Sequence, residues 1–168
     1  KSTLADGHHR APLFLRVNLA KISADALGQK LAALGIGFAA VPPLPETLML
    51  TENAARLAAS DIIAQGWAEL QDASSQAVVA ALDLPQTGRI MDFCAGGGGK
   101  TLAMAARVTG PLFAHDADPR RMRDLPDRAK RAGVAVTVLE NAAKSAPYDV
   151  ILTDVPCSGS GSWRRDPQ

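Results

Sequence analysis

The stretch MDFCAGGGGKTLAM, residues 91–104, combines an aspartate, a thiol, a run of glycines, a lysine and a threonine. Glycine adopts backbone conformations that other residues avoid, so such a run typically turns backbone N–H groups toward a ligand. A triphosphate-binding loop has the pattern G-x-x-x-x-G-K-[ST], and counting back from Gly99 puts Cys94 where its first glycine belongs. The dinucleotide pattern G-x-G-x-x-G also fails, because Thr101 and Leu102 occupy its last position.

A second acidic position is Asp116, 20 residues beyond Gly96 at the end of another apolar run. In nucleoside-cofactor sites of alternating strand–helix folds, a carboxylate in that place accepts hydrogen bonds from both ribose hydroxyls. Together with Asp92 and the glycines, it favours a cationic sulfonium cofactor with an adenosine end. A P-loop nucleotide-binding module stays as the alternative. Lys100 can reach a phosphate, and residues 149–154 (DVILTD) resemble an apolar strand that ends in a magnesium-binding aspartate.

Another group of reactive residues occupies positions 154–167, DVPCSGSGSWRRDP, directly after an apolar run. A loop at the carboxyl end of a strand, beside the cofactor loop, is where substrate lies in such folds. Methylation at carbon 5 of a pyrimidine requires a thiolate to add at carbon 6, which suits Cys157, while Asp154 can stabilise the adduct. Burial among apolar residues is the commoner fate of a cysteine. The Pro-Cys-Ser-Gly setting favours the catalytic interpretation.

Alternating strands and helices from residue 89 onward predict how these loops are positioned. Residues 89–94, 111–116, 134–139 and 148–154 have the composition of strands, and residues 74–85, 100–108 and 119–133 that of helices, the last interrupted by Pro126. Apolar strands that alternate with helices predict a parallel sheet covered on both faces. Ligands of such a sheet bind beyond the carboxyl ends of its strands.

A separate unit precedes this pattern. Residues 12–18 (PLFLRVN) have the composition of a strand, and residues 23–35 predict a helix that Ser23 caps and Gly35 ends. Short strands are expected near residues 38–41 and 47–50. The sequence therefore predicts a small α+β segment over residues 1–66 and an α/β domain over residues 67–168.

Composition narrows the class of protein. The chain has 168 residues, of which 47% are apolar and 21% charged, with a net charge of +1, as is ordinary for a globular protein. The least charged stretch, residues 31–45, is too short to span a bilayer, so we expect no membrane segment. No secretory signal is visible, and we expect a cytoplasmic protein. Because Cys94 and Cys157 lack zinc-ligand spacing, we expect no metal.

Basic residues crowd positions 120–131, and two interpretations of them stay open: a solvated helix face or a contact with RNA. A chain with a net charge of +1 must bind RNA through local patches. Arg164 and Arg165, beside the Cys157 loop, are the better candidates for phosphate contacts.

Four motifs, LRVN, GWAELQDASSQ, DFCAGGGGKT and DVPCSGSGSWRRDP, occur in the order found in one known family. The chain resembles the Sun family of RNA cytosine-5 methyltransferases, which use S-adenosylmethionine. The resemblance implies a doubly wound, Rossmann-like class I methyltransferase sheet, preceded by an α+β segment similar to an RNA-recognition motif, and a ribosomal RNA substrate. It implies Asp154 and Cys157 as catalytic residues. It implies as cofactor residues Cys94, Ala95, Gly96, Gly97, Gly98, Gly99, Lys100, Asp116 and Asp154, with Glu140 or Asn141 facing the adenine.

The chain departs from the family pattern in two places. Gly96 and Gly97 stand where the family has alanine and proline, which should loosen the loop without removing its N–H groups. The family's later Thr-Cys-Ser motif, whose thiol attacks carbon 6, does not occur, so Cys157 can act either in product release or as the nucleophile. The related fold also has further strands, so we expect an incomplete sheet with strand 149–154 beside the first strand, and no methyl transfer by this chain alone.

Overall fold

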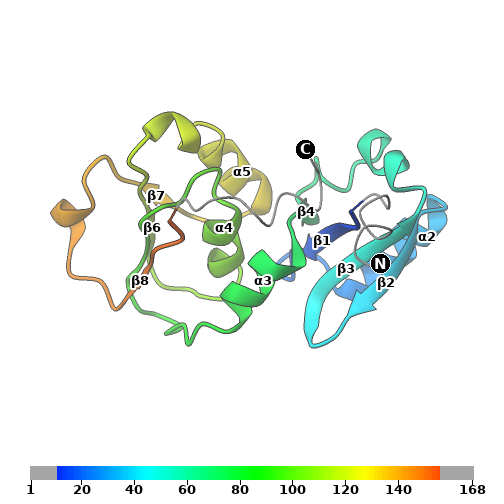
Figure 1. Cartoon of the computed structure of the whole chain (residues 1–168), viewed down its shortest axis with the longest axis horizontal. Coiled ribbons are helices and arrows are strands. Elements are labelled where there is room, and N and C mark those ends of the chain that lie inside the picture. The colour runs from blue at the N-terminus through cyan, green and yellow to red at the C-terminus, as the bar shows by residue number, and fades with distance from the viewer. Residues whose placement is uncertain (1–10, 156–168) are drawn as a thin grey trace, which may run out of the picture.

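The computed structural model describes residues 11–155 and contains two α/β units that lie side by side (Figure 1). Each unit is built on one four-stranded sheet in the described part of the chain. The first sheet has the strand order β2-β3-β1-β4 and the second has the order β7-β6-β5-β8.

The N-terminal unit follows the expected order of strand, helix and two strands. It contains β1 (Leu13–Val17), α2 (Ala24–Ala33), β2 (Gly37–Val41), β3 (Leu44–Glu52), the 3-10 helix η1 (Ala54–Ala59) and β4 (Ala68–Leu70). Ser23 caps α2 by accepting a hydrogen bond from the Ala26 N–H, as its position in the sequence predicts. All strand pairs are antiparallel. Leucines of α2 and the strands form the core between helix and sheet, together with Leu57 of η1 and with Ile36 and Ile62 from connecting segments.

Strand β4 extends this sheet beyond residue 66, where the sequence pattern divides the chain. It pairs with β1, with Leu15 opposite Leu70 and Val17 opposite Ala68. A strand of three residues is too short to show alternation of apolar and polar side chains, so periodicity does not reveal it. The strand brings residues 68–70 to the boundary between the two units (Figure 1).

The second unit has the alternating pattern that the sequence predicts. Its elements are α3 (Ala73–Ala80), β5 (Ile90–Asp92), α4 (Gly99–Ala105), β6 (Leu112–Ala114), η2 (Pro119–Met122), α5 (Leu125–Ala132), β7 (Thr137–Val138), η3 (Ala142–Ser145) and β8 (Val150–Leu152). All strands of this sheet are parallel, and β8 pairs with β5 as expected. Buried residues of α3 and α4 pack with Ile90 and Leu112 on one face, and Ala142 packs with Met91 and Phe113 on the other.

Three local details differ from the expectation. The α3 helix begins at Ala73, where Asp72 caps it by accepting from the Ser74 N–H, and it ends at Ala80 rather than at residue 85. Pro126 lies in the first turn of α5, where its missing N–H is tolerated, so the interruption precedes it between η2 and α5. The strand expected over residues 134–139 shortens to Thr137–Val138. Across residues 11–155, no helix has the length and apolar character needed to cross a bilayer.

Candidate functional site

The glycine loop joins the end of β5 to the start of α4, as the sequence predicts. Gly96 and Gly98 have φ values of 51° and 81°, in the left-handed region that favours glycine. The Ala95 N–H donates to the His115 carbonyl at 2.9 Å, and the Gly98 N–H donates to the Ala95 carbonyl at 2.8 Å. The loop is therefore folded over the carboxyl ends of the two central strands, β5 and β6.

Asp116, just past the end of β6, lies directly beside this loop. Its Oδ2 accepts a hydrogen bond of 2.9 Å from the Gly96 N–H, and its Oδ1 accepts one of 3.0 Å from the Asp118 N–H. Arg121 also reaches Oδ2, at 3.2 Å, from a half-exposed position. The carboxylate is only 4% exposed. The strand order thus brings the loop and this acid together at one edge of the sheet.

Asp92, at the end of β5, is the most deeply buried acid of the site. Its Oδ2 accepts a hydrogen bond of 2.7 Å from the Thr101 hydroxyl, and its side chain is 1% exposed. Burial raises the pKa of Asp92 above its ordinary value, the Thr101 hydrogen bond opposes this, and the charge of Asp154 adds to it. Within the described chain, Asp92 Oδ1 is a buried atom without a hydrogen-bond partner. Such an atom is costly unless a donor reaches it.

Lys100 and Asp154 connect the start of α4 to the end of β8. The Lys100 ammonium lies 2.6 Å from Asp154 Oδ2, and the Asp154 side chain is 52% exposed. Because β8 pairs with β5, Asp154 stands beside the glycine loop, as expected. The lysine that a P-loop would direct at a phosphate therefore binds a carboxylate in this structure.

The remaining predicted residues fall into two groups. Asn141 caps η3 by accepting from the Ala143 N–H, while Glu140 is exposed at the end of β7. Neither side chain is hydrogen-bonded to the glycine loop within the part of the chain that the structure describes. The Cys94 thiol is free and half-buried within the loop. Cys157, Arg164 and Arg165 lie outside the described residues.

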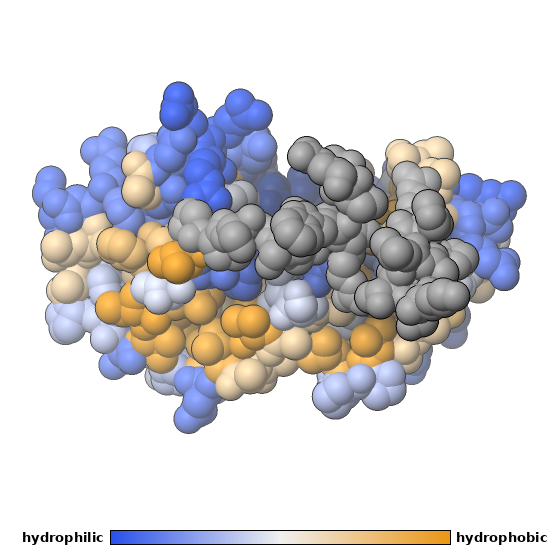
Figure 2. Space-filling model, viewed as in Figure 1, coloured by the Kyte–Doolittle hydropathy of each residue, from blue (hydrophilic) through white to orange (hydrophobic). Residues whose placement is uncertain are grey.

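The basic stretch at positions 120–131 is largely neutralised by neighbouring carboxylates. Arg120 pairs with Asp118 and Arg123 with Asp124, at 2.8 and 3.4 Å. The other pairs are Arg121 with Asp116, and both Arg128 and Arg131 with Glu69. Figure 2 shows hydrophilic residues gathered over η2 and α5. These pairs favour a solvated face with structural contacts over a patch of free positive charge.

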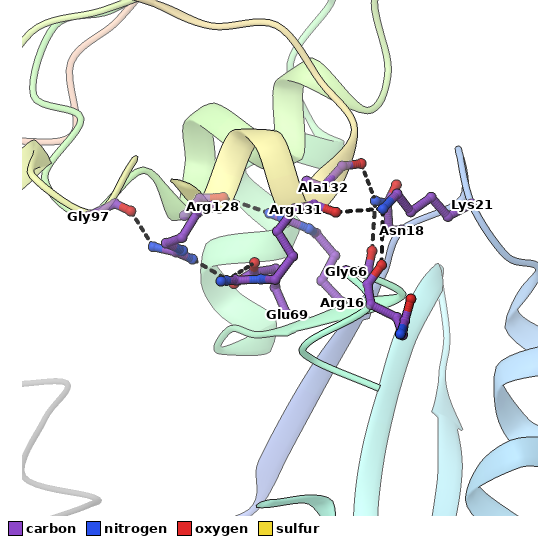
Figure 3. A network of polar contacts seen from close by, with 11 residues as sticks. Arg16, Asn18, Lys21, Gly66, Glu69, Gly97, Arg128, Arg131 and Ala132 are labelled. Carbon is purple, nitrogen blue, oxygen red and sulfur yellow. Dashed lines mark hydrogen bonds and ion pairs between the residues drawn. The ribbon is translucent and has the colours of Figure 1, made fainter. Parts of the chain in front are cut away.

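The sequence did not predict that three charged residues lie near the loop: Arg16 on β1, Glu69 on β4 and Arg128 on α5 (Figure 3). Arg16 donates to the Gly99 carbonyl at 2.6 Å, and Arg128 donates to the Gly97 carbonyl. The available signal was a charged residue inside the apolar strand LFLRV. Its partner cannot be read from the sequence, because it lies 83 positions away.

Two family models of known proteins match this chain. Residues 79–168 match the family described as 16S rRNA methyltransferase RsmB/F. The chain belongs to this family. Residues 1–56 match the ferredoxin-like domain of the RsmF/B-like methyltransferases, which agrees with the β-α-β-β order of the N-terminal unit. The resemblance to the Sun family and the expected fold class are confirmed.

Two curated relatives in the RsmB/F family cover nearly the whole chain. Ribosomal RNA small subunit methyltransferase B of Salmonella arizonae is 35% identical in an alignment of 169 positions, which covers 95% of this chain and 39% of that protein. The protein of the same name from Escherichia coli is 32% identical in an alignment of 176 positions, which covers 99% of this chain and 41% of that protein. The chain thus spans about two fifths of the length of the curated relatives it matches.

A solved structure supports the same family relationship. The methyltransferase homolog protein from Pyrococcus horikoshii superposes with a TM-score of 0.83 at 30% identity, over 94% of this chain and 54% of that one. The two units of this chain and their arrangement therefore have a counterpart in a solved protein.

Proposed function

We propose that the protein is an RNA methyltransferase that uses S-adenosylmethionine and methylates carbon 5 of a cytosine in ribosomal RNA. The observation that carries the proposal is the hydrogen bond from the Gly96 N–H to the Asp116 carboxylate. It joins the loop and the acid that a nucleoside cofactor requires into one site. A ribosomal RNA substrate also implies a cytoplasmic protein.

The donors and acceptors of the site fit an adenosyl sulfonium compound. Asp116 would accept from a ribose hydroxyl, because a carboxylate has about four lone-pair sites and its three partners here leave room for one more donor. Asp92, with its unpartnered Oδ1, offers an acceptor to a cationic group. Glycines 96–99 add no side chains of their own at this edge of the sheet. S-adenosylmethionine, when bound, supplies an electrophilic methyl group.

The residues around the loop would have distinct roles. The loop residues Cys94, Ala95, Gly96, Gly97, Gly98, Gly99 and Lys100 would hold the cofactor. Lys100 fixes the carboxylate of Asp154 between the loop and the substrate side of β8. Glu140 is the better candidate to face the adenine, because Asn141 is engaged as a helix cap. Cys157 follows Asp154 by three positions and would attack the base or release the product.

Calorimetry with S-adenosylhomocysteine tests the cofactor assignment. We expect binding by the wild-type chain and a loss of about tenfold or more in affinity for Asp116→Asn, because hydrogen bonds to a charged acceptor are among the stronger ones. Asp118→Asn is the matched control, since this neighbouring acid is exposed and pairs with Arg120. The measurement is repeated with ATP and magnesium. Tight ATP binding, or equal effects of the two substitutions, would contradict the proposal.

A further inference from the structure

The glycine loop has little conformational preference of its own. Its four consecutive glycines allow many backbone conformations, and two of them have positive φ. A flexible loop must be ordered before its N–H groups can hold a ligand, and that ordering weakens binding. Something outside the loop must therefore fix its conformation.

Two guanidinium groups hold the loop through its carbonyl oxygens. Arg128 donates through Nη1 to the Gly97 carbonyl and through Nη2 to Glu69 Oε2, the latter at 2.8 Å. Arg16 donates through Nη1 to the Gly99 carbonyl at 2.6 Å and to Gln71 Oε1 at 2.7 Å. Figure 3 shows Arg128 directed at Gly97 and Glu69. Two alternate carbonyls of the loop are thus fixed, which sets the direction of the peptide groups between them.

These contacts depend on the N-terminal unit. Arg16 lies on β1 and Glu69 on β4, and both side chains are almost fully buried, at 7% and 8% exposed. Burial lowers the pKa of Arg16 to about 10, while the charge of Glu69 acts in the opposite direction. A buried guanidinium is costly unless its donors find acceptors. The Gly99 carbonyl and Gln71 supply those acceptors at the boundary between the units.

We propose that the N-terminal unit supports the cofactor site of the second unit: Arg16, and Glu69 through Arg128, position the glycine loop by holding the Gly99 and Gly97 carbonyls. The identity of the ligand rests on the proposed function, but the positioning of the loop does not. Arg16, Glu69 and Arg128 are positioning residues in this arrangement. The N-terminal unit supplies Arg16 and Glu69, and is therefore required for cofactor binding even though the residues that contact the cofactor lie on the second unit.

Arg131 provides a matched control for Arg128. Both lie on α5, both pair with Glu69, at 2.8 and 3.0 Å, and their side chains are similarly buried, at 23% and 29% exposed. Of these two arginines, only Arg128 also donates from its side chain to a loop carbonyl within the described part of the chain. Lysine at either position keeps a positive charge beside Glu69. A single ammonium, however, cannot reproduce the planar fork that reaches Glu69 and the carbonyl together.

The experiment compares Arg128→Lys with Arg131→Lys in the full chain by two measurements. Amide hydrogen exchange at residues 96–100 reports the order of the loop without any ligand, and calorimetry with S-adenosylhomocysteine reports affinity. For Arg128→Lys we expect exchange in the loop to accelerate and affinity to fall about tenfold or more. For Arg131→Lys we expect changes of about threefold or less. Equal effects of the two substitutions on loop exchange would overturn the proposal.

A second substitution separates loop positioning from loss of folding. Gly97 has no positive φ, and a Cβ there would lie 3.3 Å from Arg128 Nη1, so Gly97→Ala fits best when that side chain is shortened. Alanine at this position reduces the number of backbone conformations that the loop can adopt when it is not held in place. The double variant should regain slower exchange at residues 96–100. A double variant that exchanges as fast as Arg128→Lys would contradict the proposal. If the wild-type chain binds no S-adenosylhomocysteine, the proposed function fails, and loop exchange still decides the role of Arg128.

Discussion

At the residue scale, the site consists of acids that differ in how their charges are satisfied. Asp116 has three partners around its carboxylate, whereas Asp92 has one hydrogen bond and an unpartnered oxygen atom among the described residues. The first accepts hydrogen bonds from two backbone N–H groups and lies 3.2 Å from Arg121. Burial raises the pKa of the second, and one of its oxygen atoms could still accept from a donor.

This difference predicts how stability depends on pH. Burial raises the pKa of Asp92 above its ordinary value of 3.8, so the folded chain holds the proton more tightly than the unfolded chain. The free energy of unfolding should therefore fall as pH rises from that value through the raised pKa, and stay low above it. Asp92→Asn keeps an acceptor for Thr101 and removes the charge. We expect it to match the wild type near about pH 4 and to exceed it by about 1–3 kcal/mol at neutral pH.

Urea unfolding at a series of pH values measures this effect. Asp83→Asn is the control, because it removes one carboxylate from an exposed position. A stability loss in Asp92→Asn that is the same at acidic and neutral pH would show that the carboxylate is satisfied when ionised.

At the scale of elements, the turn from β5 into α4 determines the shape of the site. Gly98 has a φ of 81°, and a Cβ at this position would collide with Leu125 of α5. Gly99 begins the helix, and a Cβ there would make an ordinary contact of 3.4 Å with Gln71 Nε2. Of these adjacent glycines, Gly98 is required by its backbone conformation and by the lack of space, whereas Gly99 is required by neither.

Alanine substitutions at these two positions should separate in stability. Gly98→Ala combines a left-handed backbone with crowding against Leu125, and should lower the free energy of unfolding by about 1–3 kcal/mol. Gly99→Ala replaces a poor helix former in α4 and should be neutral or stabilising by up to about 1 kcal/mol. Chemical denaturation of both variants beside the wild type checks this. Equal losses would mean that a side chain is tolerated no better at Gly99 than at Gly98.

Local elements were predictable where a short stretch of sequence contains the whole signal. The α2 helix combines Ser23 as a cap with leucines at helical spacing, and β5 and β6 are apolar runs bounded by turn residues. Strand β4 was not predicted, because its formation depends on pairing with β1, about 50 residues earlier. The adjacency of Asp116 and the glycine loop followed from the order of parallel strands. The contacts of Arg16 and Glu69 did not, since they arise only when two units dock.

At the scale of the whole molecule, the two units are joined by buried polar contacts as well as by packing. Asn18 Nδ2, 7% exposed as a residue, donates to the Gly66 carbonyl at 2.9 Å in the first unit and to the Ala132 carbonyl at 2.8 Å in the second. The Thr47 hydroxyl donates to Gln76 Oε1 at 2.7 Å across the same boundary, and Glu46 pairs with Arg107. If the units separate, Asn18 loses its Ala132 partner and Thr47 and Gln76 lose each other, so the units should unfold together.

Asn18→Ala tests this cooperation because it removes both hydrogen bonds and leaves the Gly66 and Ala132 carbonyls unpaired. We expect the free energy of unfolding to fall by about 2–3 kcal/mol, and to fall equally in native-state hydrogen exchange of β3 and of β5. Lys21→Met is the matched control. Lys21 also donates to carbonyls of both units, Gln65 and Arg131, but from an exposed position, so its loss should cost about 0.5 kcal/mol or less. Destabilisation confined to β3 would show that the units unfold independently, and the glycine loop would then keep its order without the N-terminal unit.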